Sequence, residues 1–381
     1  MRKNKRIVSI VGARPQFIKA SVLSRSLKKA GMTEIMVHTG QHYDPAMSDI
    51  FFNDLQIAKP AYHLGIGSAS HGEQTGRMLM EIEKVLQNEK PDCAVVFGDT
   101  NSTLAGALAA AKLHIPLAHV EAGLRSFNKN MPEEINRLLS DHLAALLFCP
   151  TTTAIENLRR EGLANPPGPS NRTGQRGGKP IPLICHTGDL MYDLAMEVSA
   201  TIDQAAILAK FSLPAKAFIL ATIHRAENTD DPVNLENIIL AMADLAKSGI
   251  PVFFPIHPRT RKSWRAITHG GYPLPPLFAI HDPVSYPEMI ALENAARVII
   301  TDSGGVQKEG YFFKTPCLIP RQESEWTELI DAKWNTLCMP RRKDIFKKAL
   351  ALYNFPGQRR WRNFFGNGDA AERMSGIIKN Y

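Results

Sequence analysis

The chain has 381 residues, 44% of them apolar, and its 45 Lys and Arg against 37 Asp and Glu give a net charge of +8. This length favours two domains over one, and the composition is that of an ordinary globular protein. A basic balance favours an anionic partner, either a nucleic acid or a phosphorylated small molecule. The basic residues match no nucleic-acid-binding motif, so we expect no nucleic-acid partner.

No N-terminal stretch has the basic, apolar and small-residue order of a signal peptide. No segment approaches the roughly 20 apolar residues that a membrane-spanning helix needs. The five cysteines are scattered and form no Cys-x-x-Cys pair, which indicates buried free thiols in a reducing compartment. We therefore expect a cytoplasmic protein that does not interact with a membrane.

Apolar runs of strand length alternate with helix-length segments along the whole chain. They are Ile7–Val11, Glu34–Thr39, Cys93–Phe97, Leu117–Val120 and Leu146–Cys149, followed by Phe218–Ile223, Val252–Ile256, Leu277–Ile280, Val298–Thr301 and Cys317–Ile319. Continuous apolar strands separated by helices are typical of parallel sheets covered on both faces. The sequence predicts an α/β protein with two doubly wound, Rossmann-like domains that face each other across a cleft.

A stretch rich in Pro and Gly separates the two sets of strands. It covers residues 164–182 and is typical of a linker. We place the first domain at 1–182 including this linker, the second at 183–360, and a helix that returns to the first domain at 361–381. Because ligands bind at the carboxyl ends of strands in open α/β sheets, the turns that follow the strands are the candidate site.

Two turns of the first half carry residues suited to chemistry. After the first strand, Gly12 permits close backbone approach, and Arg14 and Lys19 lie beside a helix N-terminus that can bind an anion. A plain turn with surface bases explains these residues equally well. After the third strand comes Asp99, which is either a helix cap or a carboxylate at a central strand end.

Two turns of the second half suit phosphate binding. Ser303, Gly304 and Gly305 expose backbone N–H groups at a helix start, and Glu309 lies one turn further, within reach of a ribose. The alternative is a glycine-rich turn with a solvated Glu. His224 begins the other turn; a lone histidine there is more often structural, but its neighbour Arg225 favours a role beside a diphosphate.

Two further carboxylates, Glu121 and Glu133, follow the fourth strand. Glu133 lies in the first turn of a helix, where the helix dipole favours a carboxylate regardless of function. Together with Asp99, His224 and the phosphate-competent turns, these residues indicate a nucleotide-sugar enzyme. No complete dinucleotide-binding or Walker glycine pattern occurs in the chain.

A series of short motifs covers nearly the whole chain in a fixed order. They are Gly12–Lys19, Thr39–His42, Phe97–Thr100, Val120–Arg125, Pro132–Arg137, His224–Asn228 and Thr301–Gly305. This series resembles the UDP-N-acetylglucosamine 2-epimerase family. The resemblance implies a glycosyltransferase-B-like architecture, a UDP-binding second domain, a homodimer and a place in polysaccharide biosynthesis. It also implies interconversion of UDP-GlcNAc and UDP-ManNAc by elimination and re-addition of UDP through a 2-acetamidoglycal, with no cofactor and no required metal.

The resemblance implies roles for individual residues. Asp99, Glu121 and Glu133 would supply the acid–base carboxylates, with the base unassigned among them, and His224 would steady the leaving phosphates. The implied substrate-binding residues are Arg14, Lys19, Gln41, His42, Arg125, Arg137, Arg225, Asn228, His257, Ser303, Gly304, Gly305, Glu309 and Arg321. Of these, Arg14, Lys19, Ser303 and Gly304 would hold UDP and Glu309 its ribose.

The sequence departs from the commonest family pattern, because Gly-Thr-Arg-Pro-Glu appears as Gly12–Gln16 with the sequence GARPQ. Relatives that act on UDP-2,3-diacetamido-2,3-dideoxyglucuronic acid resemble this variant, so the sugar is open between that acid and UDP-GlcNAc. A hydrolysing epimerase that releases ManNAc and UDP, a glycosyltransferase of the same fold, and an inactive UDP-sugar sensor remain alternatives.

Some family members bind a second UDP-GlcNAc as an activator through residues that match Gln41, Arg225 and His257. Asp44 of this chain adds a carboxylate near that position, which disfavours a diphosphate. We therefore expect no activation by a second substrate molecule.

Overall fold

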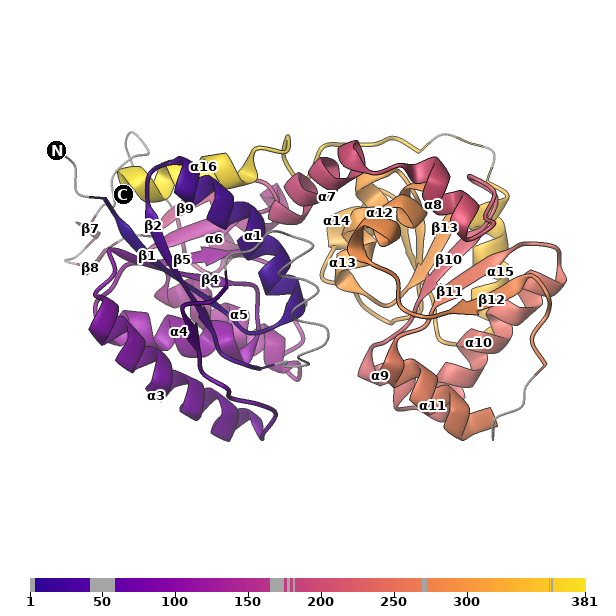
Figure 1. Cartoon of the computed structure of the whole chain (residues 1–381), viewed down its shortest axis with the longest axis horizontal. Coiled ribbons are helices and arrows are strands. Elements are labelled where there is room, and N and C mark those ends of the chain that lie inside the picture. The colour runs from indigo at the N-terminus through magenta and orange to yellow at the C-terminus, as the bar shows by residue number, and fades with distance from the viewer. Residues whose placement is uncertain are drawn as a thin grey trace. The chain divides into compact units, whose positions relative to one another are not determined.

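The computed structural model describes residues 4–41, 59–164, 175–176, 179–180, 182–268, 273–355, 357 and 359–381. The chain divides into two compact units. The first comprises Met1–Leu194 with Asn363–Tyr381, and the second comprises Ala195–Arg362. Each unit holds one parallel sheet with helices on both of its faces (Figure 1).

The first unit is built on a seven-stranded parallel sheet in the order β3-β2-β1-β4-β5-β6-β9. Its strands are β1 (Arg6–Val11), β2 (Thr33–His38), β3 (Tyr62–His63), β4 (Cys93–Phe97), β5 (Leu117–Val120), β6 (Leu146–Cys149) and β9 (Leu183–His186). The order of β1 to β6 is that of dinucleotide-binding sheets and reverses between β1 and β4. The turns after these two strands therefore lie where such sheets bind ligands.

Helices cover both faces of this sheet. They are α1 (Arg14–Lys29), α3 (His71–Glu89), α4 (Asn101–Lys112), α5 (Pro132–Leu143), α6 (Thr152–Arg160) and α16 (Ala370–Asn380). α4 approaches the sheet closely, because a Cβ on Gly106 would lie only 2.8 Å from Ile10 Cδ1. α16 packs beside α1 (Figure 1), where Ser26 Oγ and Ser375 Oγ are 2.8 Å apart. The expected return of the C-terminal helix to the first domain is confirmed.

The boundary between the units differs from the one that we predicted at residue 183. β9 pairs in parallel with β6, with Leu146 opposite Leu183 and Cys149 opposite His186. A strand that follows a linker can join the open edge of the sheet before it, and its apolar pattern does not reveal which sheet it joins. Within the predicted linker, β7 (Gln175–Arg176) and β8 (Lys179–Pro180) form an antiparallel pair; most of the rest lies outside the described residues.

The second unit repeats the same strand order, β12-β11-β10-β13-β14-β15, with all strands parallel. These strands are β10 (Ile219–Thr222), β11 (Val252–Pro255), β12 (Phe278–His281), β13 (Val298–Thr301), β14 (Cys317–Ile319) and β15 (Asn335–Leu337). The order reverses between β10 and β13, so the turns after these strands are the expected ligand-binding edge of this sheet.

Alternating residues of the second sheet enter two separate cores. Ile219 and Ala221 pack with Leu235 of α10 on one face, whereas Leu220 packs with Leu292 of α12 on the other. The helices are α7 (Leu190–Thr201), which crosses the boundary between the units, α8 (Gln204–Lys210), α9 (Ala226–Thr229), α10 (Pro232–Lys247), α11 (Pro258–Thr268), α12 (Tyr286–Ala295), α13 (Gly304–Phe312), α14 (Thr327–Asp331) and α15 (Arg342–Tyr353). Burial of both faces explains the continuous apolar runs and confirms the two Rossmann-like domains.

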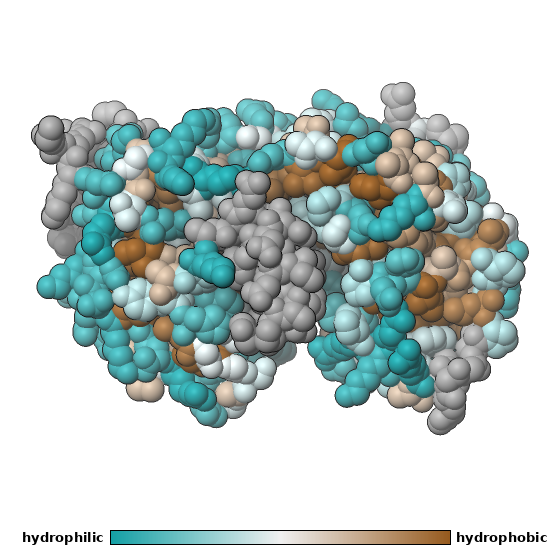
Figure 2. Space-filling view, in the orientation of Figure 1, coloured by the Kyte–Doolittle hydropathy of each residue, from teal (hydrophilic) through white to brown (hydrophobic). Residues whose placement is uncertain are grey.

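Figure 2 shows a face of mainly hydrophilic residues with smaller hydrophobic patches between them. Among the described residues, no helix is both long and apolar enough to cross a membrane.

All five cysteines are free, and burial raises the pKa of the Cys93 thiol to about 12, so this thiol stays protonated at neutral pH.

Candidate active site

One buried side chain, Gln16, joins the turns that follow β1 and β4. Its Oε1 accepts hydrogen bonds from the backbone N–H groups of Gly12 at 2.7 Å and Ala13 at 3.1 Å. Its Nε2 donates to the carbonyl oxygen of Phe97 at 2.5 Å and to Thr100 Oγ1 at 3.0 Å. Because the same amide serves both turns, it fixes them relative to each other at the edge where the strand order reverses.

Gly12 permits the turns after β1, β2 and β4 to meet. A Cβ at this position would lie 2.0 Å from Ser102 Oγ and 2.3 Å from Thr39 Oγ1, so only glycine fits. Gln41, which we expected to bind substrate, accepts hydrogen bonds from the N–H of Ser102 at 3.0 Å and from its hydroxyl at 2.7 Å. Its Oε1 thus occupies the N-terminus of α4.

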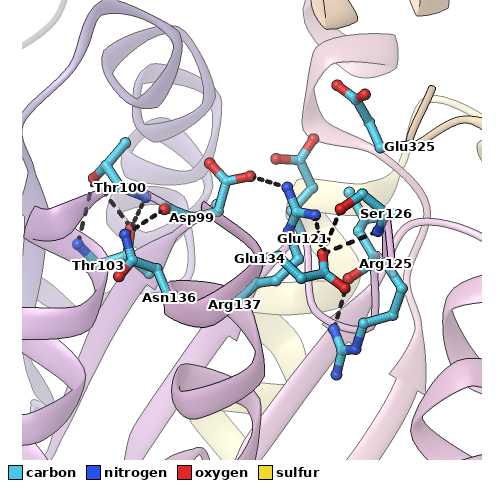
Figure 3. A network of polar contacts seen from close by, with 12 residues as sticks. Asp99, Thr100, Thr103, Glu121, Arg125, Ser126, Glu134, Asn136, Arg137 and Glu325 are labelled. Carbon is cyan, nitrogen blue, oxygen red and sulfur yellow. Dashed lines mark hydrogen bonds and ion pairs between the residues drawn. The ribbon is translucent and has the colours of Figure 1, made fainter. Parts of the chain in front are cut away.

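Asp99 follows β4 and is held from two directions by α5. Its Oδ2 lies 2.5 Å from the guanidinium of Arg137, and its carbonyl oxygen accepts a hydrogen bond from Asn136 Nδ2 at 2.9 Å. The side chain of Asp99 remains 33% exposed. Figure 3 shows the carboxylate facing Arg137. Asp99 is therefore both oriented and accessible, as a proton-transfer group has to be.

Glu121 follows the neighbouring strand β5 and forms an ion pair with Lys19. Its φ of 72° lies in the left-handed region, which costs a non-glycine residue on the order of 1 kcal/mol. The N–H groups of Glu121 and Ala122 both donate to the carbonyl oxygen of Phe148 at 3.1 Å and hold this conformation. A Cβ on Gly98 would lie 3.5 Å from Glu121 Oε2, so this carboxylate reaches the turn that carries Asp99.

Glu134, which we did not single out from the sequence, organises the loop before α5. Its carboxylate accepts hydrogen bonds from the N–H groups of Ser126 at 2.9 Å and Phe127 at 3.0 Å and from Arg137 at 2.5 Å (Figure 3). Burial raises the pKa of Glu134, but the Ser126 N–H and the Arg137 guanidinium outweigh it and hold the pKa below its usual value. The adjacent Glu133 is half-buried, and no described residue forms a hydrogen bond with its carboxylate.

Arg125, which we expected to bind substrate, is buried in a network of charges. Its Nη1 lies 2.7 Å from Asp141 Oδ2, and its Nε and Nη2 donate to Glu161 at 2.7 Å and 2.6 Å. The guanidinium is 1% exposed. Asp141 also accepts hydrogen bonds from the N–H of Gly123 at 3.0 Å and from His119 Nδ1 at 2.7 Å. The guanidinium of Arg125 thus donates to acceptors of the protein within this unit, Asp141 and Glu161.

In the second unit, Asp302 anchors the turn that follows β10. This fully buried carboxylate accepts hydrogen bonds from the backbone N–H groups of His224 at 3.0 Å and Arg225 at 3.1 Å and from Asn228 Nδ2 at 3.0 Å. The imidazole of His224 is 39% exposed, with its Nδ1 3.8 Å from Asp302 Oδ1. Asn228 is therefore used inside the protein, whereas the ring of His224 is accessible.

The start of α13 lies beside this turn. Ser303 caps the helix by accepting a hydrogen bond from the N–H of Val306 at 3.5 Å. A Cβ on Gly304 would lie 2.5 Å from Glu325 Oε1, so the carboxylate of Glu325 reaches the start of α13. Further along the helix, Glu309 is buried and accepts a hydrogen bond from the hydroxyl of Tyr286 at 2.8 Å.

Arg321 and His257, which we also expected to bind substrate, lie near the turn that follows β10. Arg321 is buried and pairs with Glu227 at 2.7 Å and with Glu325 at 3.2 Å. The rings of His224 and His257 lie 5.7 Å apart between centroids. The second unit therefore gathers accessible imidazoles and a helix N-terminus, which suit an anion.

Residues 25–379 match the family model described as UDP-N-acetylglucosamine 2-epimerase. The chain belongs to the UDP-N-acetylglucosamine 2-epimerase family. A similar protein from Methanococcus maripaludis, described as a UDP-N-acetylglucosamine 2-epimerase homolog, is 45% identical over 98% of this chain and 99% of its own length. The UDP-2,3-diacetamido-2,3-dideoxy-D-glucuronate 2-epimerase of Pseudomonas aeruginosa is 46% identical over 97% of this chain and 98% of its own.

Solved structures of this epimerase family have the same fold. The UDP-GlcNAc 2-epimerase of Methanocaldococcus jannaschii, solved in complex with UDP-GlcNAc and UDP, matches with a TM-score of 0.84 at 39% identity. The match covers 99% of this chain and 100% of that one. The expected glycosyltransferase-B-like fold class is confirmed.

The structure distributes the family's expected site residues over both units. The first unit holds Lys19, Gln41, Asp99, Glu121, Arg125, Glu133 and Arg137, and the second holds His224, Arg225, Asn228, His257, Ser303, Gly304, Gly305, Glu309 and Arg321. His42 and Asp44 lie outside the described residues, as does the side chain of Arg14. Within the described part of the chain, no group of three or more His, Cys, Asp and Glu is placed to hold a metal ion.

Proposed function

We propose that the protein catalyses the 2-epimerisation of a UDP-N-acetylhexosamine, interconverting UDP-GlcNAc and UDP-ManNAc. The observation that carries this proposal is a pair of carboxylates after adjacent parallel strands, each beside its own cation. Asp99 lies beside Arg137, and Glu121 lies beside Lys19. Two separately held carboxylates at a ligand-binding edge suit a reaction that removes and returns a proton.

The reaction proceeds by elimination and re-addition. No carbonyl group lies next to C2 of the sugar ring, so the C2 proton is too weakly acidic for simple removal and return. A base therefore takes this proton while the C1–O bond to UDP breaks. The electron pair of the C2–H bond forms a C1=C2 double bond, and UDP leaves with the electrons of the C1–O bond. UDP then adds back to C1 as a proton is delivered to the other face of C2.

We assign proton transfer to Asp99, Glu121 and Glu133 of the first unit. The exposed part of Asp99 and the pairing of Glu121 with Lys19 support the first two assignments. Glu133 has no cation beside it among the described residues, which leaves its carboxylate available as a proton carrier. Lys19 then acts as the charge partner of Glu121 and lies beside the reacting carboxylate.

We assign UDP binding to the turns after β10 and β13. The accessible imidazole of His224 and the backbone N–H groups of Gly304 and Gly305, which follow the Ser303 cap, suit a diphosphate, and Glu309 suits the paired hydroxyls of a ribose. Anchoring of the first turn by Asp302 supports this assignment, because Asp302 holds the backbone of His224 while 39% of the histidine side chain stays exposed.

A second candidate substrate is UDP-2,3-diacetamido-2,3-dideoxyglucuronic acid. The observation that favours it is the 46% identity to the Pseudomonas aeruginosa enzyme named for this sugar. The GARPQ form of the first motif, Gly12–Gln16, resembles relatives that act on this sugar and is a second argument for it.

We also propose that the protein works as a homodimer in the cytoplasm. Ile135 and Leu139, one turn apart on α5, are 45% and 46% exposed, a pattern that suits contact with another chain. The free cysteines suit a reducing compartment.

The test is to incubate the protein in D₂O with UDP-GlcNAc and, separately, with its diacetamido uronic acid analogue, and to follow both by NMR. We expect the 2-epimer of one sugar nucleotide to form with deuterium at C2, and prolonged incubation to release UDP and a 2-acetamidoglycal. An epimer that carries no deuterium would exclude elimination. Free ManNAc would identify a hydrolysing epimerase, and UDP binding without turnover would identify a sensor.

A further inference from the structure

His119 lies in β5, fully buried, between two hydrogen-bond acceptors. Its Nδ1 is 2.7 Å from Asp141 Oδ1, and its Nε2 is 2.7 Å from the carbonyl oxygen of Gly98. A carbonyl oxygen only accepts hydrogen bonds, so Nε2 has to carry a proton. A neutral imidazole has one N–H, so the state of Nδ1 depends on whether Asp141 is ionised.

The surroundings of Asp141 keep it ionised. Its Oδ2 accepts hydrogen bonds from Arg125 and from the N–H of Gly123, and both are donors to a carboxylate. Burial raises the pKa of Asp141, but His119 and Arg125 outweigh it and hold the pKa below its usual value. With Asp141 ionised, both nitrogens of His119 face atoms that only accept hydrogen bonds.

The charges of this buried network then balance. If both nitrogens of His119 carry a proton, His119 and Arg125 supply two positive charges against the two negative charges of Asp141 and Glu161. The thiol of Cys149 also lies close to Asp141, and burial raises the pKa of this thiol well above its usual value, so it stays neutral. A neutral His119 would leave one buried negative charge in excess, which is costly in such a site.

The network spans the turns of both candidate catalytic carboxylates. Gly98, whose carbonyl oxygen His119 binds, has a φ of 62° and directly precedes Asp99. Gly123, whose N–H Asp141 binds, follows Glu121 by two residues and has a φ of 81°. The contact of His119 with Asp141 therefore joins the backbone beside one carboxylate to the backbone beside the other.

We propose that His119 is a positioning residue: as an imidazolium, it holds the Gly98–Asp99 peptide to Asp141 and so orients Asp99 for proton transfer. This proposal rests on the proposed epimerase function. His119 is fully buried and acts through the Gly98 carbonyl group, not on the substrate. A misplacement of about 1 Å in a reacting group can cost about a hundredfold in rate. Loss of His119 should therefore lower kcat.

The first variant is His119→Phe, which keeps a planar ring and removes both donors. We expect kcat to fall about 10-fold to 100-fold, and deuterium incorporation at C2 to slow by the same factor, with KM and the Kd for UDP within about threefold. The matched control is His142→Phe, an exposed histidine near the end of α5, which should change kcat less than about twofold. A kcat of His119→Phe within twofold of the unaltered protein would overturn the proposal.

The second variant is Asp141→Asn, which keeps the shape and removes the charge. Its amide oxygen can accept from Arg125 and Gly123, and its NH₂ group can donate to His119 Nδ1. The ring then becomes neutral while Nε2 still donates to Gly98. We expect kcat to stay within about fivefold of the unaltered protein, well above that of His119→Phe.

The protonation state is read directly from ¹⁵N NMR of histidine-labelled protein at pH 7.5. We expect two similar ¹⁵N shifts for His119, typical of two protonated nitrogens, and in Asp141→Asn two widely separated shifts with the proton on Nε2. A neutral pattern in the unaltered protein would overturn the imidazolium even if His119→Phe fails to fold. Absence of turnover by the unaltered protein would instead overturn the proposed function, and the ¹⁵N pattern would still test the imidazolium.

Discussion

The two sheets have the same strand order, but the edges where that order reverses use carboxylates in opposite ways. In the first unit, Asp99 and Glu121 lie at strand ends beside Arg137 and Lys19, and Asp99 stays partly exposed. In the second unit, Asp302 is fully buried and accepts two backbone N–H groups. An Asp that follows a buried strand thus has a different role in each sheet. Asp99 presents a partly exposed carboxylate, whereas the carboxylate of Asp302 holds the backbone of a neighbouring turn.

This difference comes from the partners of each carboxylate and not from its place in the strand order. A cation beside a carboxylate stabilises its charge and leaves other lone pairs for a substrate. Backbone N–H groups around a buried carboxylate use those lone pairs inside the protein. Replacing each carboxylate by its amide should therefore impair proton transfer in the first unit and binding or stability in the second.

The largest effect should come from Asp99→Asn, Glu121→Gln and Glu133→Gln. Each should lower turnover at least about a hundredfold and leave UDP binding within a few-fold, because proton-transfer groups typically contribute about 10²–10⁴ in rate. Initial rates and UDP titration calorimetry measure the two quantities. A variant that turns over at the rate of the unaltered protein would show that its carboxylate takes no part in proton transfer.

Asp302→Asn should show the opposite pattern. The amide would point an NH₂ group at backbone donors of His224 and Arg225, which leaves a buried group without an acceptor and costs about 1–3 kcal/mol. We expect a lower free energy of unfolding in urea and weaker UDP binding. If this variant lost only turnover, with stability and UDP affinity unchanged, the contrast between the two edges would be wrong.

The sequence predicted the sheets, the four strand-to-helix turns, and the location of Asp99 and Glu121 at strand ends, because each of these depends on local patterns. It did not reveal Gln16, Glu134 or the pairing of His119 with Asp141. The contacts of Gln16 with Phe97 and of His119 with Asp141 join residues far apart in the chain and depend on which strands are neighbours. Those of Glu134 are local, but they depend on the fold of the loop before α5. The spacing of Glu134, Arg137 and Asp141 along one face of α5 was the available signal, since polar residues at helical spacing can mark a buried polar face.

Gln16→Leu tests how far the first edge depends on its bridging amide. Leu fits the volume but leaves the N–H groups of Gly12 and Ala13 without their acceptor. We expect the free energy of unfolding to fall by about 1–3 kcal/mol, measured by urea denaturation. Gln87→Leu, at an exposed position of α3, is the matched control and should change stability by less than about 0.5 kcal/mol. Equal effects of the two substitutions would show that the bridge contributes nothing.

The smallest effect concerns a carboxylate without a cation, Asp193 of α7. Its Oδ2 accepts a hydrogen bond from the N–H of Ala371 at 2.9 Å, whereas its Oδ1 is buried and has no partner among the described residues. Burial, with the nearby Asp189 and Asp369 as smaller causes, raises the pKa of Asp193 from 3.8 to about 6. This site thus tests what a carboxylate does without the positive charge that Asp99 and Glu121 have beside them.

Because the folded pKa of Asp193 lies above the unfolded one, the folded state binds the proton more tightly. The stability that this proton contributes is complete below about pH 4 and is lost as the pH rises through about 6. Asp193→Asn stays neutral at every pH, so its free energy of unfolding should exceed that of the unaltered protein by about 1–2 kcal/mol at pH 7.5 and by little at pH 4.5. Urea denaturation of both proteins at the two pH values measures this difference. A difference that does not change with pH would show that Asp193 is ionised in the folded protein throughout this range, as a carboxylate with a cation beside it would be.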